Sequence, residues 1–220
     1  FKIGHFEAYD LSPAGQDTYV VGYGDDVYRA KDGRGRNSAT NGGQIMLSKE
    51  AGQWHYEVTT QFGADGDTAL PVYGPYAVKN KDPLLVRPVV AWTGDTVTVA
   101  VGAEVNLISD AYVADLGGSN ARESISDWTG YAATASAKVN DDLSVSLRGA
   151  YRNGDEFDQY SVGPGVQYQN FYAAYLFGKT SVNDSDVDVK TNVAYASYKI
   201  PGVMGLDNFD MYLGASWGNE

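Results

Sequence analysis

The feature that most constrains the fold of this chain is a repeated alternation of apolar and polar residues with a period of two. In one segment, Leu143, Val145 and Leu147 alternate with serines. Such a period is typical of a β-strand, because successive side chains point to opposite faces. The clearest segments of this kind are 53–63, 96–107, 143–152 and 209–218, and weaker ones are 131–139, 160–168 and 171–177. We therefore expect an all-β fold of about ten or eleven strands, with no convincing helix.

The two faces of these strands help to separate two kinds of β-protein. Alternation alone suits a soluble sandwich, such as a lectin-like sugar-binding module, as well as a membrane-spanning barrel. The polar faces are rich in Ser, Thr, Gly, Asn and Gln, whereas the apolar faces are aliphatic bands that end in aromatic residues. These are Trp54, Phe62, Trp92, Tyr131, Tyr151, Tyr160, Tyr168, Phe171, Phe177, Phe209 and Trp217. Rings at both ends of an aliphatic band are typical of a strand that crosses a bilayer, although Tyr and Trp also favour strands in general.

The connections between the expected strands alternate in length. The short ones are 51–53, 93–95, 140–142, 169–170 and 201–208, and the long ones are 64–82, 109–127, 153–159 and 179–188. An antiparallel up-and-down barrel of an outer membrane has this asymmetry, with tight turns on one side and long loops on the other. The alternation therefore favours a transmembrane β-barrel.

Composition excludes several other classes of protein. No apolar run approaches the ~18 residues that a spanning helix needs, whereas a spanning strand needs only ~9–11. The chain has no Cys, which excludes disulfides and thiolate metal sites. Its net charge of −12, from 28 acidic and 16 basic residues, argues against a nucleic-acid partner. If the acidic residues face a lumen, they would favour the passage of cations.

One long segment, 7–40, contains no clean strand. Its acids are Glu7, Asp10, Asp17, Asp25, Asp26 and Asp32, its aromatic residues are Tyr9, Tyr19, Tyr23 and Tyr28, and its bases are Arg29, Lys31, Arg34 and Arg36. An unstructured segment of this length within a compact domain is usually functional. We expect it to fold into the barrel and narrow the pore, as a constriction loop. Its tyrosines could stack on sugar rings or simply pack the loop against the wall.

The first twenty residues, FKIGHFEAYDLSPAGQDTYV, carry a resemblance to a known family. They resemble the passage from strand into constriction loop of Gram-negative carbohydrate porins, with the raffinose-porin (glycoporin) group as the nearest likeness. The resemblance implies a barrel in the outer membrane, in contact with lipid and lipopolysaccharide, monomeric or a homotrimer. It also implies a water-filled channel for passive diffusion of small hydrophilic solutes, sugars and oligosaccharides among them, with no cofactor.

The resemblance further implies a constriction in which acids of the inward loop face bases of the wall. On the loop side these would be Glu7, Asp10, Asp25 and Asp26, and on the wall Arg87, Arg148 and Arg152. Together with residues of the loop segment, the candidate constriction and solute-binding set is Glu7, Asp10, Tyr19, Tyr23, Asp25, Asp26, Arg29, Arg34, Arg36, Arg87, Arg148 and Arg152.

A full porin of this kind is expected to have about 16 strands, more than this chain supplies. Open sheet edges in lipid would leave unpaired backbone groups, which the bilayer does not tolerate. We therefore expect residues 1–220 to be one β-barrel domain that is part of a longer porin.

Other chemistry finds little support in the sequence. The segment 214–218 fits the G-x-S-x-G pattern of a nucleophile elbow, but that motif needs a helix after the strand, so we predict no enzymatic activity. The chain has two histidines. We interpret His5 as a residue that precedes the loop and His55 as a residue that faces the lumen. The acidic run 184–188 lacks the Gly and Glu that an EF-hand requires, so we predict no metal site there, while an incidental calcium stays open.

Overall fold

The computed structural model describes residues 1–11, 28–30, 32–34, 42–63, 77–115, 122–124, 127–155, 157–183, 188–205 and 209–219. Most of them form one antiparallel sheet of 11 strands, in which the spatial order of the strands follows the order along the chain. Its strands are β1 (Lys2–Gly4), β2 (Gly43–Ala51), β3 (Trp54–Phe62), β5 (Leu84–Thr93), β6 (Val97–Asn106), β9 (Trp128–Lys138), β10 (Leu143–Gly154), β11 (Phe157–Tyr168), β12 (Phe171–Val182), β13 (Asp188–Ile200) and β14 (Met211–Asn219). This confirms the predicted all-β, up-and-down architecture.

A second, smaller sheet lies within the connections and was not predicted. It has three strands in the order β4 (Ala77–Lys79), β7 (Tyr112–Asp115) and β8 (Arg122–Ser124). The described residues also include the 3₁₀ turns η1 (Asp32–Arg34) and η3 (Val203–Gly205). Among the described residues, no helix has the length and apolar character needed to cross a membrane.

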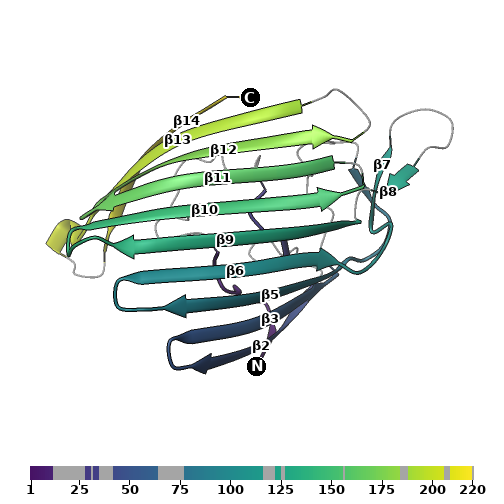
Figure 1. Cartoon of the computed structure of the whole chain (residues 1–220), viewed down its shortest axis with the longest axis horizontal. Coiled ribbons are helices and arrows are strands. Elements are labelled where there is room, and N and C mark those ends of the chain that lie inside the picture. The colour runs from purple at the N-terminus through teal and green to yellow at the C-terminus, as the bar shows by residue number, and fades with distance from the viewer. Residues whose placement is uncertain are drawn as a thin grey trace.

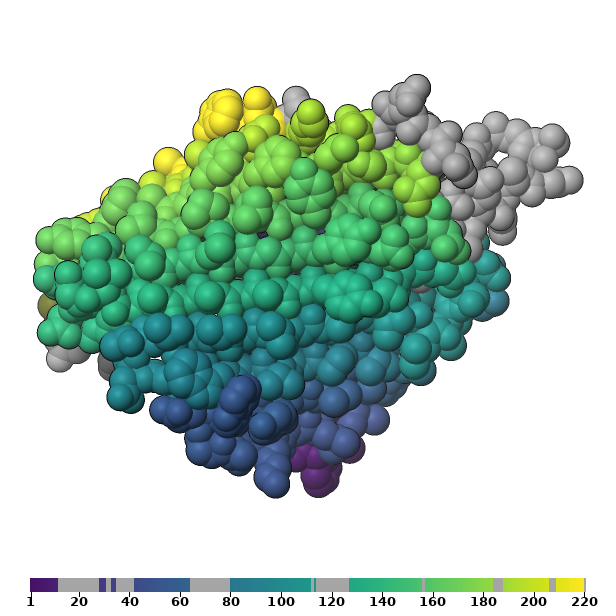
Figure 2. Space-filling model, in the orientation of Figure 1, coloured from purple at the N-terminus to yellow at the C-terminus, as the bar shows by residue number. Residues whose placement is uncertain are grey.

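The large sheet has an apolar outer face and a polar inner face. Figure 1 shows it as one broad curved sheet, with N-terminal segments (purple) behind it. On the outer face Tyr131 and Leu147 are each 53% exposed, whereas on the inner face Arg87 is 1% and Glu104 0% exposed. A water-soluble protein usually exposes its charged residues and buries its large apolar ones. The strands from β5 to β12 lie largely uncovered on the outer face in Figure 2, as a surface that meets hydrocarbon would.

Aromatic side chains form a band near each end of the outer face. At the end with short turns, Trp54 pairs with Trp92 across β3 and β5. At the opposite end, Tyr131 pairs with Tyr151, which pairs in turn with Tyr160 across β9, β10 and β11. Aromatic girdles at the two interfaces are characteristic of outer-membrane barrels. The register therefore bears out the prediction made from the ends of the aliphatic bands.

The predicted alternation of short and long connections holds for only part of the sheet. The spans 63–83 and 107–127 are long, as expected, but β10 and β11 are joined by residues 155–156 alone. The predicted long loop 153–159 is therefore wrong. The pairing of β10 with β11 continues to Asn153 and Asp158, close to the end of the hairpin. The Asn153 amide donates a 2.8 Å hydrogen bond to the Asp158 carboxylate there.

The short turns are stabilised by local polar contacts. Between β9 and β10, the Asn140 side-chain oxygen accepts hydrogen bonds from the backbone N–H groups of Asp142 and Leu143, both at 2.9 Å. Asn is favoured in turns because its side chain can satisfy nearby backbone donors in this way. Between β2 and β3, Gly52 has a φ of 61°, which glycine adopts without steric cost.

Candidate pore constriction

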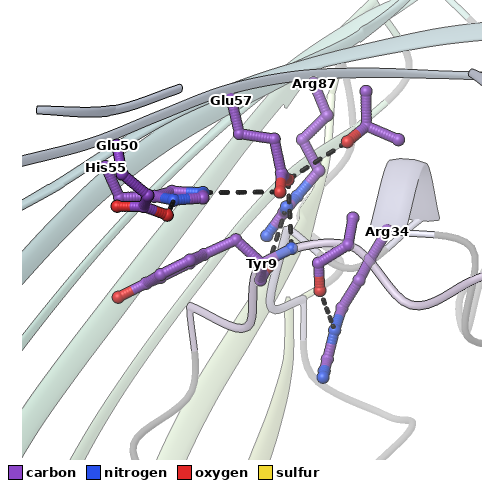
Figure 3. Close-up of polar contacts among 8 residues, drawn as sticks. Tyr9, Arg34, Glu50, His55, Glu57 and Arg87 are labelled. Carbon is purple, nitrogen blue, oxygen red and sulfur yellow. Dashed lines mark hydrogen bonds and ion pairs between the residues drawn. The ribbon is translucent and has the colours of Figure 1, made fainter. Parts of the chain in front are cut away.

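The described parts of the segment 7–40 lie against the polar inner face of the sheet, and hydrogen bonds attach them to it. On β3, Glu57 Oε1 accepts a hydrogen bond from the Tyr9 N–H at 3.0 Å. On the adjacent β2, Gln44 Oε1 accepts from the N–H of Phe6, just before this segment, at 3.1 Å. These contacts join the start of the segment to the two neighbouring strands, and Figure 3 shows the one between Glu57 and Tyr9.

Arg87 on β5 joins two separate parts of the segment. Its Nε donates to the Ala30 carbonyl at 2.9 Å and its Nη1 donates to the Tyr9 carbonyl at 3.0 Å. Glu57 on β3 and Glu104 on β6 lie close enough to stabilise its charge. A buried guanidinium is costly unless hydrogen bonds and opposite charges compensate it, and here two carbonyl hydrogen bonds and the nearby carboxylates do so. Arg87 therefore anchors the segment to the middle of the wall.

Glu104 accepts hydrogen bonds from the segment at two points. Tyr28 Oη donates to Glu104 Oε1 at 2.7 Å, and the Gly33 N–H donates to Oε2 at 3.1 Å. The tyrosine hydroxyl reaches this position because β9 has a glycine there: a Cβ on Gly130 would lie 1.6 Å from it. On β11, Ser161 Oγ donates to the Tyr28 carbonyl at 2.6 Å.

Arg152 on β10 is held between two aromatic rings. Its guanidinium carbon lies 4.2 Å from the ring centroid of Tyr28 and 4.2 Å from that of Trp128. The two rings are 6.4 Å apart and inclined at 70°. Cation–π contacts of this kind are strengthened where water is excluded, and Arg152 is buried. Tyr28 thus contacts residues of β6, β9, β10 and β11 on the inner face of the sheet.

Two of the four predicted loop acids, Glu7 and Asp10, pair with an arginine of their own segment. Arg34 forms ion pairs with Glu7 at 3.1 Å and with Asp10 at 2.9 Å, and its Nε donates to the Ala8 carbonyl at 3.3 Å. The Ala8 N–H donates to the Arg34 carbonyl at 3.0 Å. The wall in turn contributes acids as well as bases. Among the described residues, the separation of loop acids from wall bases is therefore less complete than the resemblance implied.

His55, on the inner face of β3, lies between two carboxylates and a ring. Its Nδ1 contacts Glu50, its Nε2 lies 3.5 Å from Glu57 Oε2, and its ring stacks on Tyr9 with centroids 5.0 Å apart. Burial, together with the negative charges of Asp10, Glu50 and Glu57, raises the pKa of the Tyr9 phenol above its usual value. The Tyr9 phenol is therefore neutral at physiological pH. Figure 3 shows its ring beside that of His55.

The inner face carries all three predicted wall arginines. Arg87, Arg148 and Arg152 are buried there, and Arg29 is half-buried. Five predicted site residues lie outside the described residues: Tyr19, Tyr23, Asp25, Asp26 and Arg36.

The candidate site set omitted the wall groups that hold the segment, Gln44, Glu57 and Glu104. Their only signal in the sequence is an acceptor side chain on the polar face of a strand. Within the described ranges, no three His, Cys, Asp or Glu side chains are placed to hold a metal ion.

A sheet with its apolar face outside and a charged segment packed against its polar face is typical of an outer-membrane β-barrel protein. A family model described as porin-like glycoporin RafY matches residues 1–220. The chain therefore belongs to this family of porins, which are proteins of the Gram-negative outer membrane. The soluble lectin-like alternative does not fit this family or the exposed apolar face.

A solved structure supports the fold independently. The chain is similar to the loop L8 deletion mutant of OmpT, an outer membrane protein of Vibrio cholerae, with a TM-score of 0.53 and 15% sequence identity. The similarity covers 80% of this chain and 57% of that one, so the chain spans little more than half the length of this relative. No curated protein matches the chain.

Proposed function

We propose that the inner face lines a water-filled channel for passive diffusion of small neutral solutes, sugars in particular, and that the segment 7–40 narrows it. The observation that carries the proposal is the attachment of this segment to the inner face, through the buried Arg87 and Glu104. A fixed obstruction in a polar lumen excludes solutes by size, while the charges around it orient water and polar solutes. Lipopolysaccharide contacts and a homotrimer stay predictions from the resemblance.

Conductance of the purified protein in planar bilayers tests the channel directly. We expect stepwise openings, and a fall in open-channel current when raffinose is added, because a sugar within the narrow part displaces conducting ions. A protein that inserts without conductance steps would contradict the proposal. Steps that raffinose leaves unchanged would contradict only its sugar part.

Arg148 provides a test of the wall charges. We expect Arg148→Ser to shift the reversal potential toward cation selectivity, because a positive charge is removed from the lumen. Arg148→Lys keeps the charge and should keep the wild-type value. Lys199→Ser serves as a control, since Lys199 pairs with Asp210 at 2.6 Å near a connection. An unchanged potential in Arg148→Ser would show that this residue does not face the conducting path.

A further inference from the structure

A second polar site lies on the inner face, near the short-turn ends of the strands. It is a hollow of about 330 Å³, within the range of small-molecule sites. Its polar lining includes Thr98, Ser136, Ser144, Ser146, Gln167 and Tyr172, from β6, β9, β10, β11 and β12. The residues that attach the segment 7–40 to the wall do not line it.

Strand register places these side chains in two neighbouring rows. In the first row, Thr98 pairs with Ser136, and Ser136 with Ser146. Directly paired residues have Cβ atoms about 4.5–5.5 Å apart, so the three hydroxyls form an evenly spaced track across three strands.

The second row runs beside the first. Ser144 pairs with Gln167, and Gln167 pairs with Tyr172 across β11 and β12. The hydroxyls can each donate and accept hydrogen bonds, and the amide adds two donors and an acceptor. The ring of Tyr172 adds an aromatic surface, with the Tyr195 ring 6.0 Å away.

The hollow has two charged residues in its lining, Lys138 and Asp95, one of each sign. Lys138 forms an ion pair with Asp141 at 2.8 Å. The hydrogen bond from Lys138 lowers the pKa of the Asp141 carboxyl, which keeps it ionised and paired at neutral pH. The six polar side chains named above are neutral, and Lys138 continues the second row beyond Ser144. This lining suits a neutral polyhydroxy compound. An anion would instead bind near the buried arginines of the inner face, which do not line the hollow.

We propose that this hollow is a sugar-binding subsite, separate from the constriction, that binds one ring of a neutral oligosaccharide as it passes the short-turn end of the channel. The inference rests on the proposed function, because it needs a channel that admits sugars. Paired hydroxyls across several strands would exchange hydrogen bonds with sugar hydroxyls. The subsite would therefore retain the sugar without contributing to ion selectivity.

The test is the concentration of raffinose that halves the open-channel current. We expect Ser136→Ala with Ser146→Ala to raise this concentration about tenfold, since two hydrogen bonds to the sugar are lost. The conductance without sugar and the reversal potential should not change. Ser197→Ala, on the inner face of β13 and outside the hollow, should match the wild type.

Cysteine protection gives an independent measurement, because the chain has no cysteine of its own. We expect raffinose to slow the reaction of Ser144→Cys with a small water-soluble thiol reagent, but not that of Ser197→Cys. If raffinose blocks the wild type and the double alanine variant equally, and protects neither cysteine, the subsite is wrong while the channel stands. If raffinose never reduces the wild-type current, the sugar proposal and the subsite fail together.

Discussion

At the scale of residues, the inner face of the sheet accommodates the segment 7–40 through glycines that leave space for its side chains, as well as through polar side chains that bind it. Gly130 makes room for the hydroxyl of Tyr28, and Gly102 makes similar room for Leu11, since a Cβ there would lie 2.9 Å from a leucine methyl. Glycine has no Cβ and so permits close approach of a neighbouring group. The position of Tyr28 therefore depends on the missing side chain of Gly130 as well as on its contacts with Glu104 and Arg152.

The role of Gly130 predicts a change in the channel. Gly130→Ala should displace the Tyr28 ring from Glu104 and loosen the segment, giving a larger or noisier single-channel conductance. Gly149→Ala is the matched control, because the nearest atom to a Cβ there is a carbonyl oxygen at 3.6 Å, an ordinary contact. Equal conductance traces for the two variants would show that this contact does not hold the segment.

The hydrogen bond from Tyr28 to Glu104 predicts a loss of stability. Tyr28→Phe should lower the free energy of unfolding by about 1.5–3 kcal/mol, as expected for a hydrogen bond to a charged group. Urea titration of protein folded into lipid vesicles measures this quantity. Tyr131→Phe removes a hydroxyl from the exposed outer face and should change it little. A Tyr28→Phe variant as stable as Tyr131→Phe would contradict the assignment.

At the scale of elements, each strand separates lipid from water by its alternation alone. On β10, Leu147 lies on the exposed outer face, whereas Arg148 and Arg152 are buried on the inner face. This was predictable, because a period of two fixes the face of every residue once one is known. The ends of β10 and β11 were not predictable. Most residues near the hairpin that joins them are polar, so apolar and polar residues no longer alternate there although the strands remain paired.

The outer face of β10 predicts a cost that depends on depth. Leu147→Arg should destabilise the folded protein in vesicles by about 2–4 kcal/mol, because the charge would enter hydrocarbon near the middle of a strand. Val139→Arg places the same charge in the turn after β9, where the cost falls to about 0–1 kcal/mol. Similar costs for the two variants, measured by urea unfolding, would mean that Leu147 does not face lipid.

At the scale of the whole molecule, the sheet forms the wall of the proposed channel, and the described parts of the segment 7–40 pack against its polar face. The family was recognisable from residues 1–20, because a charged and aromatic passage follows the first strand there. The contacts that hold the segment were not recognisable, because they join residues far apart in the chain, such as Tyr28 and Glu104, separated by 76 positions. The pairing of Arg34 with Glu7 and Asp10 likewise depends on how the segment folds, which alternation does not determine.

The most direct test of the account is a cysteine scan along β10 in lipid vesicles. With no native cysteine to interfere, each variant reports on one position. Ser144→Cys and Ser146→Cys should react quickly with a water-soluble thiol reagent, while spin labels at Val145→Cys and Leu147→Cys should collide with oxygen dissolved in the lipid. Two results would contradict a sheet with lipid on one face and water on the other. One is fast labelling of cysteines at Val145 and Leu147 by the water-soluble reagent, and the other is shielding of these two positions from both water and lipid.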